Sequence, residues 1–488
     1  MARRVVYLHS QELIDAADDL PANEGRASLV HDLVESLDLL DDAHGENGDE
    51  GLAKARVVAP RAATRDELCR FHDARFVDVL LGRTSSVSTS SSDESSGDSS
   101  DSSPEPSFGL SRRPSSSPPP RKRPKASSDA LGLQDDCPLF PSLPQYTTLV
   151  AGASVTAARM LRDGEADVAI SWTGGRHHAK RGEASGFCYV NDIVLAIMEM
   201  KSAPKPPPPP SSPSPSSGKV DGGASSPPPV PPLRAPPKRL SRILYLDVDL
   251  HHGDGPESAF FTTPSVLTLS IHLHAPLFFP SSGALTSTGP SNTKAAGALH
   301  ALNVALEPGA GEETLKRVWG SCVEKVFGAY TPDAVVLQCG VDGLAGDPCK
   351  EWNLSLSALG ACVEAALRWD KPTLLLGGGG YNSPNAARAW AYLTSVALSR
   401  PLSLSTPIPA SLSSAQYALF APDFTLDVPA SFGMRDRNTE ETLARVESAF
   451  GEYVDGLRGR HEAKKAQEGE KGSQSQAGTG GLAGGGEA

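Results

Sequence analysis

The sequence lacks the features that mark membrane-spanning or secreted proteins. No stretch approaches the run of about 18 apolar residues that a membrane span needs. The basic start is followed by an apolar run of only four residues, which is too short for a signal peptide. The seven cysteines form no CxxC pair and no zinc-ribbon spacing, a pattern typical of reduced, intracellular proteins. We therefore expect a soluble protein of the cytosol or nucleus.

Positive charge is also in short supply. The chain has 45 Lys and Arg against 58 Asp and Glu, a formal net charge of −13. An acidic average argues against general nucleic-acid binding, which needs a basic face. It is compatible with a basic binding partner such as a lysine-rich tail, although solubility alone also accounts for it.

Aromatic residues make up only 6% of the chain, whereas proline and glycine are plentiful. Ser accounts for 12 of the 20 residues from Thr84 to Ser103, and Pro for 15 of the 36 from Ser202 to Pro237. Such segments bury too little apolar surface to offset their ordering entropy. We predict disordered inserts and a loose tail at 82–130, 202–239 and 459–488, and one domain built from 1–81, 131–201 and 240–458.

The remaining sequence alternates between strand and helix patterns. Several apolar runs are continuous, as in parallel strands covered on both faces. Predicted strands are Val5–His9, Asp167–Trp172, Ile243–Asp249, Val266–His272, Ala334–Cys339 and Thr373–Leu376. Predicted helices are Ser28–Leu40, Asp66–Leu81, Leu149–Arg162, Asn191–Met200, Glu312–Tyr330, Ser357–Trp369 and Asn385–Ser399. This alternation predicts an α/β fold, one parallel sheet with helices on both faces.

Polar segments follow four of these strands. GGRHHAK follows residue 173, DLHHGD begins at Asp249, GVD ends at Asp342, and GGGGY ends at Tyr381. In open α/β sheets, ligands bind beyond the carboxyl ends of the strands. We therefore expect these segments to meet at one rim.

The segment ILYLDVDLHH indicates a metal site. Alternation places Asp247, Asp249 and His251 on one side of an extended chain. Buried carboxylates are costly unless a cation satisfies them, and Asp and His are natural ligands of Zn²⁺. A catalytic zinc takes three protein ligands, and Asp342 is the best candidate for the third. The alternative is a polar strand end that binds loop amides.

Two further segments predict catalytic groups. His177 and His178 beside a metal suit general acid/base chemistry, with Asp247 and Asp254 available to orient their rings. The alternative is a pair of solvated loop histidines. No Gly-Lys-Ser/Thr follows the glycine run, so a phosphate loop is disfavoured. The run instead brings backbone close to the site and presents the Tyr381 hydroxyl, which could stabilise an oxyanion.

TGGRHHAKRGEASGFCYVND, RILYLDVDLHHGDG, LQCGVDGLAGDP and LLLGGGGYN resemble the signature segments of class I histone deacetylases. RASLVH and DDCP also look like that family. AGDP most resembles the class I member that acts without an obligatory corepressor complex, and its fungal relatives. The resemblance implies the arginase/deacetylase fold, with an eight-stranded parallel sheet. It also implies zinc-dependent hydrolysis of N6-acetyl-lysine in histones, with release of acetate.

The resemblance also implies roles for individual residues. Zn²⁺ would bind Asp249, His251 and Asp342, His177 would pair with Asp247 and His178 with Asp254, and Tyr381 would contact the substrate carbonyl. Gly186, Phe187 and Phe279 would line a narrow tunnel, and Asp136 would hold the substrate backbone. Arg26 would lie by an inner channel for acetate. A structural K⁺ would bind Asp247, Asp249, His251 and Ser270.

The sequence departs from the family pattern at several positions. Arg176 replaces an apolar or aromatic residue, and Cys349 replaces a pocket-lining Leu or Met, which affects the expected substrate preference. Complex-forming members carry a Lys and an Arg that help bind an inositol phosphate. Asn23 and Pro348 stand there in this chain, so dependence on that cofactor is not expected.

Two other functions are weighed against the deacetylase. A binuclear Mn²⁺ ureohydrolase of the same fold needs bridging carboxylates, but Gly253 and Leu344 occupy the corresponding positions. A catalytically idle scaffold for chromatin complexes would have lost ligands or Tyr381, and all of them are present.

A basic cluster from Arg121 to Lys125, with Arg112 and Arg113 upstream, resembles a nuclear localisation signal, although a merely solvated basic run remains an alternative. We expect residence in the nucleus, with the cytoplasm as a second location. The expected partners are acetylated lysines in histone tails and other chromatin proteins. Neither direct nucleic-acid binding nor membrane association is expected.

Overall fold

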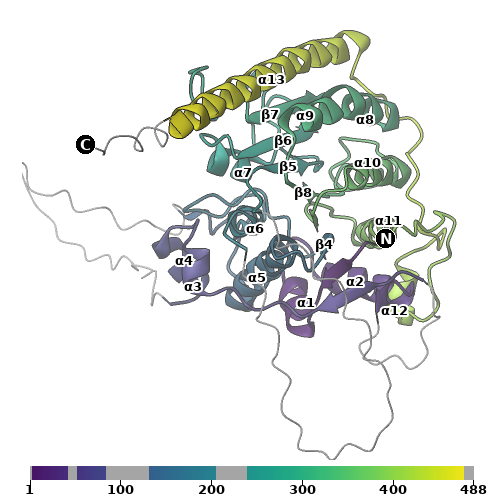
Figure 1. Ribbon diagram of the computed structural model, residues 1–488. Helices are drawn as coiled ribbons and strands as arrows, with labels where there is room; N and C mark the ends of the chain where they lie inside the picture. Colours follow the sequence, from purple (N-terminus) through teal and green to yellow (C-terminus); the bar gives the residue numbers. More distant parts are fainter. Residues whose placement is uncertain (1–2, 42–51, 84–130, 205–238, 478–488) are drawn as a thin grey trace, which may run out of the picture.

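A computed structural model describes residues 3–41, 52–83, 131–204 and 239–477, with side chains described up to residue 463. These residues form one parallel β-sheet with helices on both faces, as the sequence predicts (Figure 1). Residues 84–130 and 205–238, which make up nearly all of the two predicted inserts, lie outside the described residues. The insert boundaries and the basic cluster therefore stay predictions.

The sheet is parallel throughout, and its strand order is β2-β3-β1-β4-β9-β8-β5-β6-β7. The strands are β1 (Val5–Leu8), β2 (Leu40–Asp41), β3 (Ala55–Val58), β4 (Val168–Ser171), β5 (Ile243–Asp247), β6 (Val266–Leu273), β7 (Ala301–Leu306), β8 (Ala334–Gln338) and β9 (Thr373–Leu376). The resemblance implied eight strands, and this count is wrong for the described chain. The two-residue β2 adds a ninth by pairing with β3 at the sheet edge.

The helices pack on the sheet as two layers. They are α1 (Gln11–Asp18), α2 (Arg26–Ser36), α3 (Arg65–Leu68), α4 (Ala74–Leu80), α5 (Leu143–Arg162), α6 (Asp192–Met200), α7 (Asp254–Phe260), α8 (Glu312–Val318), α9 (Glu324–Tyr330), α10 (Leu356–Arg368), α11 (Ser383–Ala397), α12 (Ser414–Ala418) and α13 (Glu440–Ala477). None of these helices is long and apolar enough to cross a bilayer.

Strand residues alternate between two hydrophobic cores, as the pleat requires. Leu244 and Leu246 pack in the core that includes α2, α8 to α11 and α13, whereas Ile243 and Tyr245 face the core of α1 and α3 to α6. Both faces of the central strands are therefore buried, which accounts for their continuous apolar sequences.

The structure corrects two predicted elements. The single helix predicted over 312–330 is interrupted by a π-helix, η2 (Trp319–Val323), which separates α8 from α9. The tail was predicted to be loose from residue 459, yet α13 continues to Ala477 along the side of the molecule (Figure 1). Its Glu, Lys, Gln and Ala residues are good helix formers. The first residues of this tail are also docked, because Arg460 donates to the Ala295 carbonyl at 3.1 Å.

Four adjacent strands at the centre of the sheet, β4, β9, β8 and β5, run in the same direction. Their carboxyl ends lead into the four polar segments noted in the sequence. Chain order is not followed across these neighbours, which is the arrangement at which open α/β sheets form their ligand sites.

Candidate active site

The metal-ligand candidates at the end of β5 and just after it are held by a short hydrogen-bonded turn. The backbone N–H of Asp249 donates to Asp247 Oδ1 at 3.1 Å, and that of His251 donates to Asp249 Oδ1 at 3.0 Å. Both carboxylates are fully buried. Asp247, Asp249 and His251, which alternate in the sequence, are therefore linked in one turn by these hydrogen bonds.

Asp342 joins this cluster from the end of β8. Its Oδ2 lies 2.9 Å from His251 Nδ1, and Asp249 Oδ1 lies 3.3 Å from the same nitrogen. The other oxygens are engaged elsewhere: the N–H of Leu250 donates to Asp342 Oδ1 at 2.9 Å. Asp249 Oδ2 accepts from Gln338 Nε2 at 2.7 Å. One oxygen of each carboxylate is thus left to converge on the imidazole.

The glycine run after β9 closes over this cluster because it has no side chains. The N–H of Gly379 donates to Asp249 Oδ2 at 2.9 Å. A Cβ built on Gly379 would lie 2.2 Å from Asp342 Oδ2, closer than real Cβ atoms approach. The predicted close approach of this backbone to the site is therefore observed.

The charges in this cluster fit a divalent cation. Burial lowers the pKa of His251, but its bonds to Asp249 and Asp342 outweigh burial and raise that pKa to about 10. Burial raises the pKa of Asp342, and the negative charge of Asp249 beside it contributes to the same increase. Two adjacent buried carboxylates destabilise each other's charged form unless a positive charge lies beside them. Two oxygens and one nitrogen converging on one point suit a metal with one open position.

The two histidines after β4 each bind a carboxylate. His177 Nδ1 lies 2.8 Å from Asp247 Oδ2, and His178 Nδ1 lies 2.9 Å from Asp254 Oδ1. Both imidazoles are buried, so the alternative of solvated loop histidines is wrong. Each ring therefore has its Nδ1 side fixed by a carboxylate. The Nε2 of His177 lies 3.8 Å from Asp249 Oδ1, at the metal-ligand candidates.

The environments of the two rings push their pKa values in opposite directions. Burial lowers the pKa of His177, but the charges of Asp247 and Asp249 outweigh burial and raise it to about 9. Burial, together with the charge on His177, lowers the pKa of His178 to about 3. His178 is therefore the neutral ring at physiological pH, as a general base must be.

Several supporting residues were missed from sequence. The hydroxyl of Tyr245 donates to Asp247, and Lys180 pairs with Asp254. Asp192 accepts the backbone N–H of Arg176 at 2.8 Å and so fixes the histidine loop. Gln338, already described, completes this set. A polar residue inside an apolar strand, as at Tyr245 and Gln338, was the available signal.

Aromatic rings flank the site. The Phe187 ring contacts Tyr381 edge-on at 5.6 Å between centroids, and the Phe279 ring contacts His178 edge-on at 4.8 Å. Gly186 lies between, because a Cβ there would meet His178 Cδ2 at 2.6 Å and Phe279 at 2.8 Å. The structure brings these residues together beside the histidines, as the tunnel prediction requires.

The remaining predicted residues lie around this centre. Asp136 is exposed in a turn that follows Leu131, and the Leu131 carbonyl accepts the Ala184 N–H at 2.9 Å. Ser270 on β6 is the Cα partner of Asp247 in the strand register. The binding roles of both residues stay predictions.

Arg26 is buried beneath the glycine run. Its guanidinium donates to the carbonyls of Gly380 at 2.7 Å and Gly378 at 3.2 Å. It lines a cavity of about 20 Å³ together with Arg176 and Trp390, a volume sufficient for a water molecule. Burial, together with the charge of Arg176, lowers the pKa of Arg26 to about 9. The unusual Arg176 thus adds a second cation to the cavity where acetate release was predicted.

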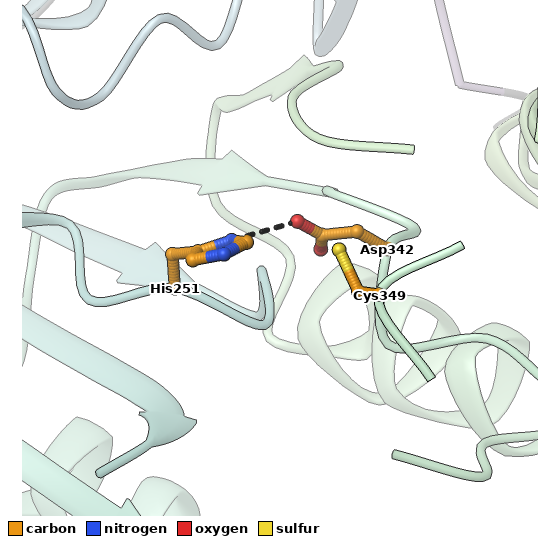
Figure 2. A group of neighbouring side chains, drawn as sticks. All are labelled: His251, Asp342 and Cys349. Carbon is orange, nitrogen blue, oxygen red and sulfur yellow. Dashed lines mark hydrogen bonds and ion pairs between the residues drawn. The ribbon is translucent and has the colours of Figure 1, made fainter. Parts of the chain in front are cut away.

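The other unusual residue, Cys349, lies at the metal-ligand cluster. Figure 2 shows its thiol with His251 and Asp342, and the three donor atoms lie within 4.8 Å of one another. Burial raises the pKa of this thiol, and the charge on Asp342 raises it further.

Comparison with known proteins agrees with this geometry. The histone deacetylase domain model matches residues 20–205 and 233–397. The chain belongs to the class I histone deacetylase family. It is 35% identical to histone deacetylase 8 of Danio rerio over 448 residues, which cover 92% of this chain and 94% of the relative. It is 34% identical to histone deacetylase 2 of Oryza sativa subsp. japonica over 446 residues, 91% of this chain and 70% of the relative.

Membership of this family makes the protein a deacetylase, a hydrolase with a metal cofactor. It confirms the resemblance drawn from the signature segments and the arginase/deacetylase fold. Histone deacetylase 8 of Xenopus tropicalis is also similar, at 33% identity over 442 residues. The two segments that match the family model contain the His177–His178 loop and the ends of β5, β8 and β9.

Proposed function

We propose that the protein hydrolyses N6-acetyl-lysine in histones with a zinc ion held by Asp249, His251 and Asp342. The observation that carries the proposal is the convergence of two buried carboxylates on His251 Nδ1, at 2.9 and 3.3 Å. A zinc ion there would polarise the acetyl carbonyl and lower the pKa of a water molecule.

The protein groups divide the proton transfers between them. Neutral His178, fixed by Asp254, takes a proton from the attacking water at its free Nε2. His177, whose pKa is raised by Asp247 and Asp249, keeps its proton and stabilises negative charge as it forms. Either ring could then protonate the lysine amine. Tyr381 donates a hydrogen bond to the carbonyl oxygen, since burial keeps its pKa raised and its phenol protonated.

The substrate side chain enters between Phe187 and Phe279, which cover its methylene stem with apolar surface. Asp136 would accept backbone N–H groups of the substrate at the rim. Acetate would leave through the cavity beside Arg26. A K⁺ ion bound by Asp247, Asp249, His251 and Ser270 would stiffen the turn after β5. We propose action in the nucleus on histones and other chromatin proteins, without need of an inositol phosphate.

The manganese ureohydrolase is the weaker alternative. A second ion would need carboxylates near the first, but Gly253 and Leu344 offer none. A Cβ on Gly253 would meet Asp247 Oδ2 at 2.2 Å, so a larger residue is also excluded there. Metal analysis separates the two functions, because the deacetylase holds one zinc per chain at this centre and a ureohydrolase two manganese ions.

The decisive experiment measures acetate release from an acetyl-lysine histone peptide. We expect Tyr381→Phe to lower kcat by about 10²- to 10³-fold, the usual effect of losing one oxyanion donor. Zinc content is measured in both proteins, and Tyr417→Phe on α12 serves as the matched control. Equal, negligible rates in the wild type and Tyr381→Phe, with zinc bound in both, would contradict the proposal.

A further inference from the structure

The loop after β8 places a thiol beside the metal-ligand candidates. The Sγ of Cys349, an oxygen of Asp342 and a ring nitrogen of His251 lie within 4.8 Å of one another, and Figure 2 shows the side chains directed toward each other. Asp342 is fully buried, whereas Cys349 is only partly buried. Cys349 and His251 are therefore the partly exposed members of the cluster, and Asp342 is its buried member.

This loop is fixed to the site by its backbone. Asp347, itself 3% exposed, accepts the N–H of Cys349 at Oδ1 at 3.0 Å and the N–H of Tyr381 at Oδ2 at 2.7 Å. One buried carboxylate thus joins the thiol-bearing loop to the segment that closes over Asp249. The position of Cys349 relative to the other donors is therefore set by the fold.

The chemistry of the donor set leaves room for sulfur. Two carboxylates and one imidazole fill three positions of a tetrahedral zinc, and one stays open. With a Zn–S bond of about 2.3 Å and a Zn–N bond of about 2.0 Å, the sulfur and nitrogen would lie about 3.5 Å apart. In the structure these atoms lie within 4.8 Å of one another, so the sulfur would have to approach the nitrogen by at most about 1.3 Å to reach that separation. A thiolate also favours zinc over harder ions such as Mn²⁺.

We infer that Cys349 is a fourth, displaceable ligand of the metal in the substrate-free protein. The S–H bond breaks as the S–metal bond forms, the proton passes to solvent, and no electron is transferred. The acetyl-lysine carbonyl and its water then replace the sulfur, which takes up a proton from solvent. This inference rests on the proposed function, because it needs the metal to bind at Asp249, His251 and Asp342.

The test uses the full chain loaded with Co²⁺ in place of zinc. We expect a sulfur-to-cobalt charge-transfer band in the near ultraviolet for the wild type and for the control Cys69→Ser. The band is absent from Cys349→Leu, which keeps the tetrahedral cobalt bands in the visible range. In Tyr381→Phe, where turnover is slow, the charge-transfer band fades as an acetyl-lysine peptide is added.

X-ray absorption of the zinc-loaded wild type gives a second reading that needs no variant. We expect a zinc–sulfur shell at about 2.3 Å. A wild type that binds cobalt without the charge-transfer band, and zinc with oxygen and nitrogen neighbours alone, overturns the inference while the deacetylase proposal stands. A wild type that binds neither ion at the site overturns both. A band that persists in Cys349→Leu assigns the sulfur elsewhere and also overturns the inference.

Discussion

The substitution Gly379→Ala tests whether the glycine run is needed for metal binding. The new Cβ would lie 2.2 Å from Asp342 Oδ2 and 3.0 Å from Asp249 Oδ2. Real Cβ atoms do not approach closer than 3.0 Å, so the Asp342 carboxylate must move by about 0.8 Å. Metal–ligand distances hold to within about 0.2 Å, so this shift is several times the tolerance.

The backbone of this glycine makes the test a clean one. Gly378 and Gly380 have φ values of 157° and 133°, whereas Gly379 is not among the residues with positive φ. Alanine at 379 therefore adds a steric conflict without backbone strain. We expect the zinc affinity to fall by about 10- to 100-fold, the range for disturbed ligand support. This corresponds to about 1.4 to 2.7 kcal/mol.

The assay is a competitive zinc titration of the purified protein against a chelator. Gly328→Ala is the control, because Gly328 is exposed on α9 and its added Cβ meets nothing within 4 Å. Thermal unfolding of the metal-free proteins checks that both variants fold. A zinc dissociation constant for Gly379→Ala within threefold of the wild type would refute the steric argument.

Two further predictions concern proton release on zinc binding and a buried group of ion pairs. Zinc binding at pH 7 should release at least one proton, because the pKa of His251 in the metal-free protein is raised to about 10 and Nδ1 must be unprotonated to bind. The affinity for zinc should therefore rise with pH up to about 10. Calorimetry in buffers of different ionisation enthalpy counts the released protons. A zinc affinity that does not change from pH 6.5 to 8.5 would contradict this expectation. Glu199→Gln should destabilise the fold by about 3 kcal/mol, because it removes the negative charge that pairs with the buried Arg162 at 2.5 Å and with two other arginines. Denaturant unfolding measures this against Glu364→Gln, whose exposed pair with Arg368 at 3.4 Å should be worth less than about 1 kcal/mol; equal losses in the two variants would show that burial does not matter here.

The core strands were predictable because both of their faces are buried. Ile243–Asp247 and Ala334–Gln338 are continuous apolar runs, and the sequence pattern found them within two residues. The edge strands β2 and β7 and the strand β3, which lies next to β2, were not predicted. β2 has two residues and exists only through its pairing with β3, and such pairing leaves no local periodic pattern.

The helical tail shows a different limit. Residues after Gly459 have the composition of a disordered segment, yet the same Glu, Lys, Gln and Ala residues favour helix once a start is provided. Val454 and Leu457 of α13 are buried in the core, and Arg460 binds the chain near Ala295. Docking of the helical turns that precede the tail therefore allows a helix that composition alone did not indicate.

The sequence by itself determined the identity of the chemical groups and their local arrangement. Asp247, Asp249 and His251 alternate along one short segment, so their common side follows from the geometry of an extended chain. The tertiary structure alone decided which distant groups meet them. Asp342 reaches His251 because β8 lies beside β5, and Cys349 reaches the same cluster because Asp347 ties its loop to the glycine run. Strand order and loop anchoring depend on the whole fold, whereas alternation depends only on neighbouring residues.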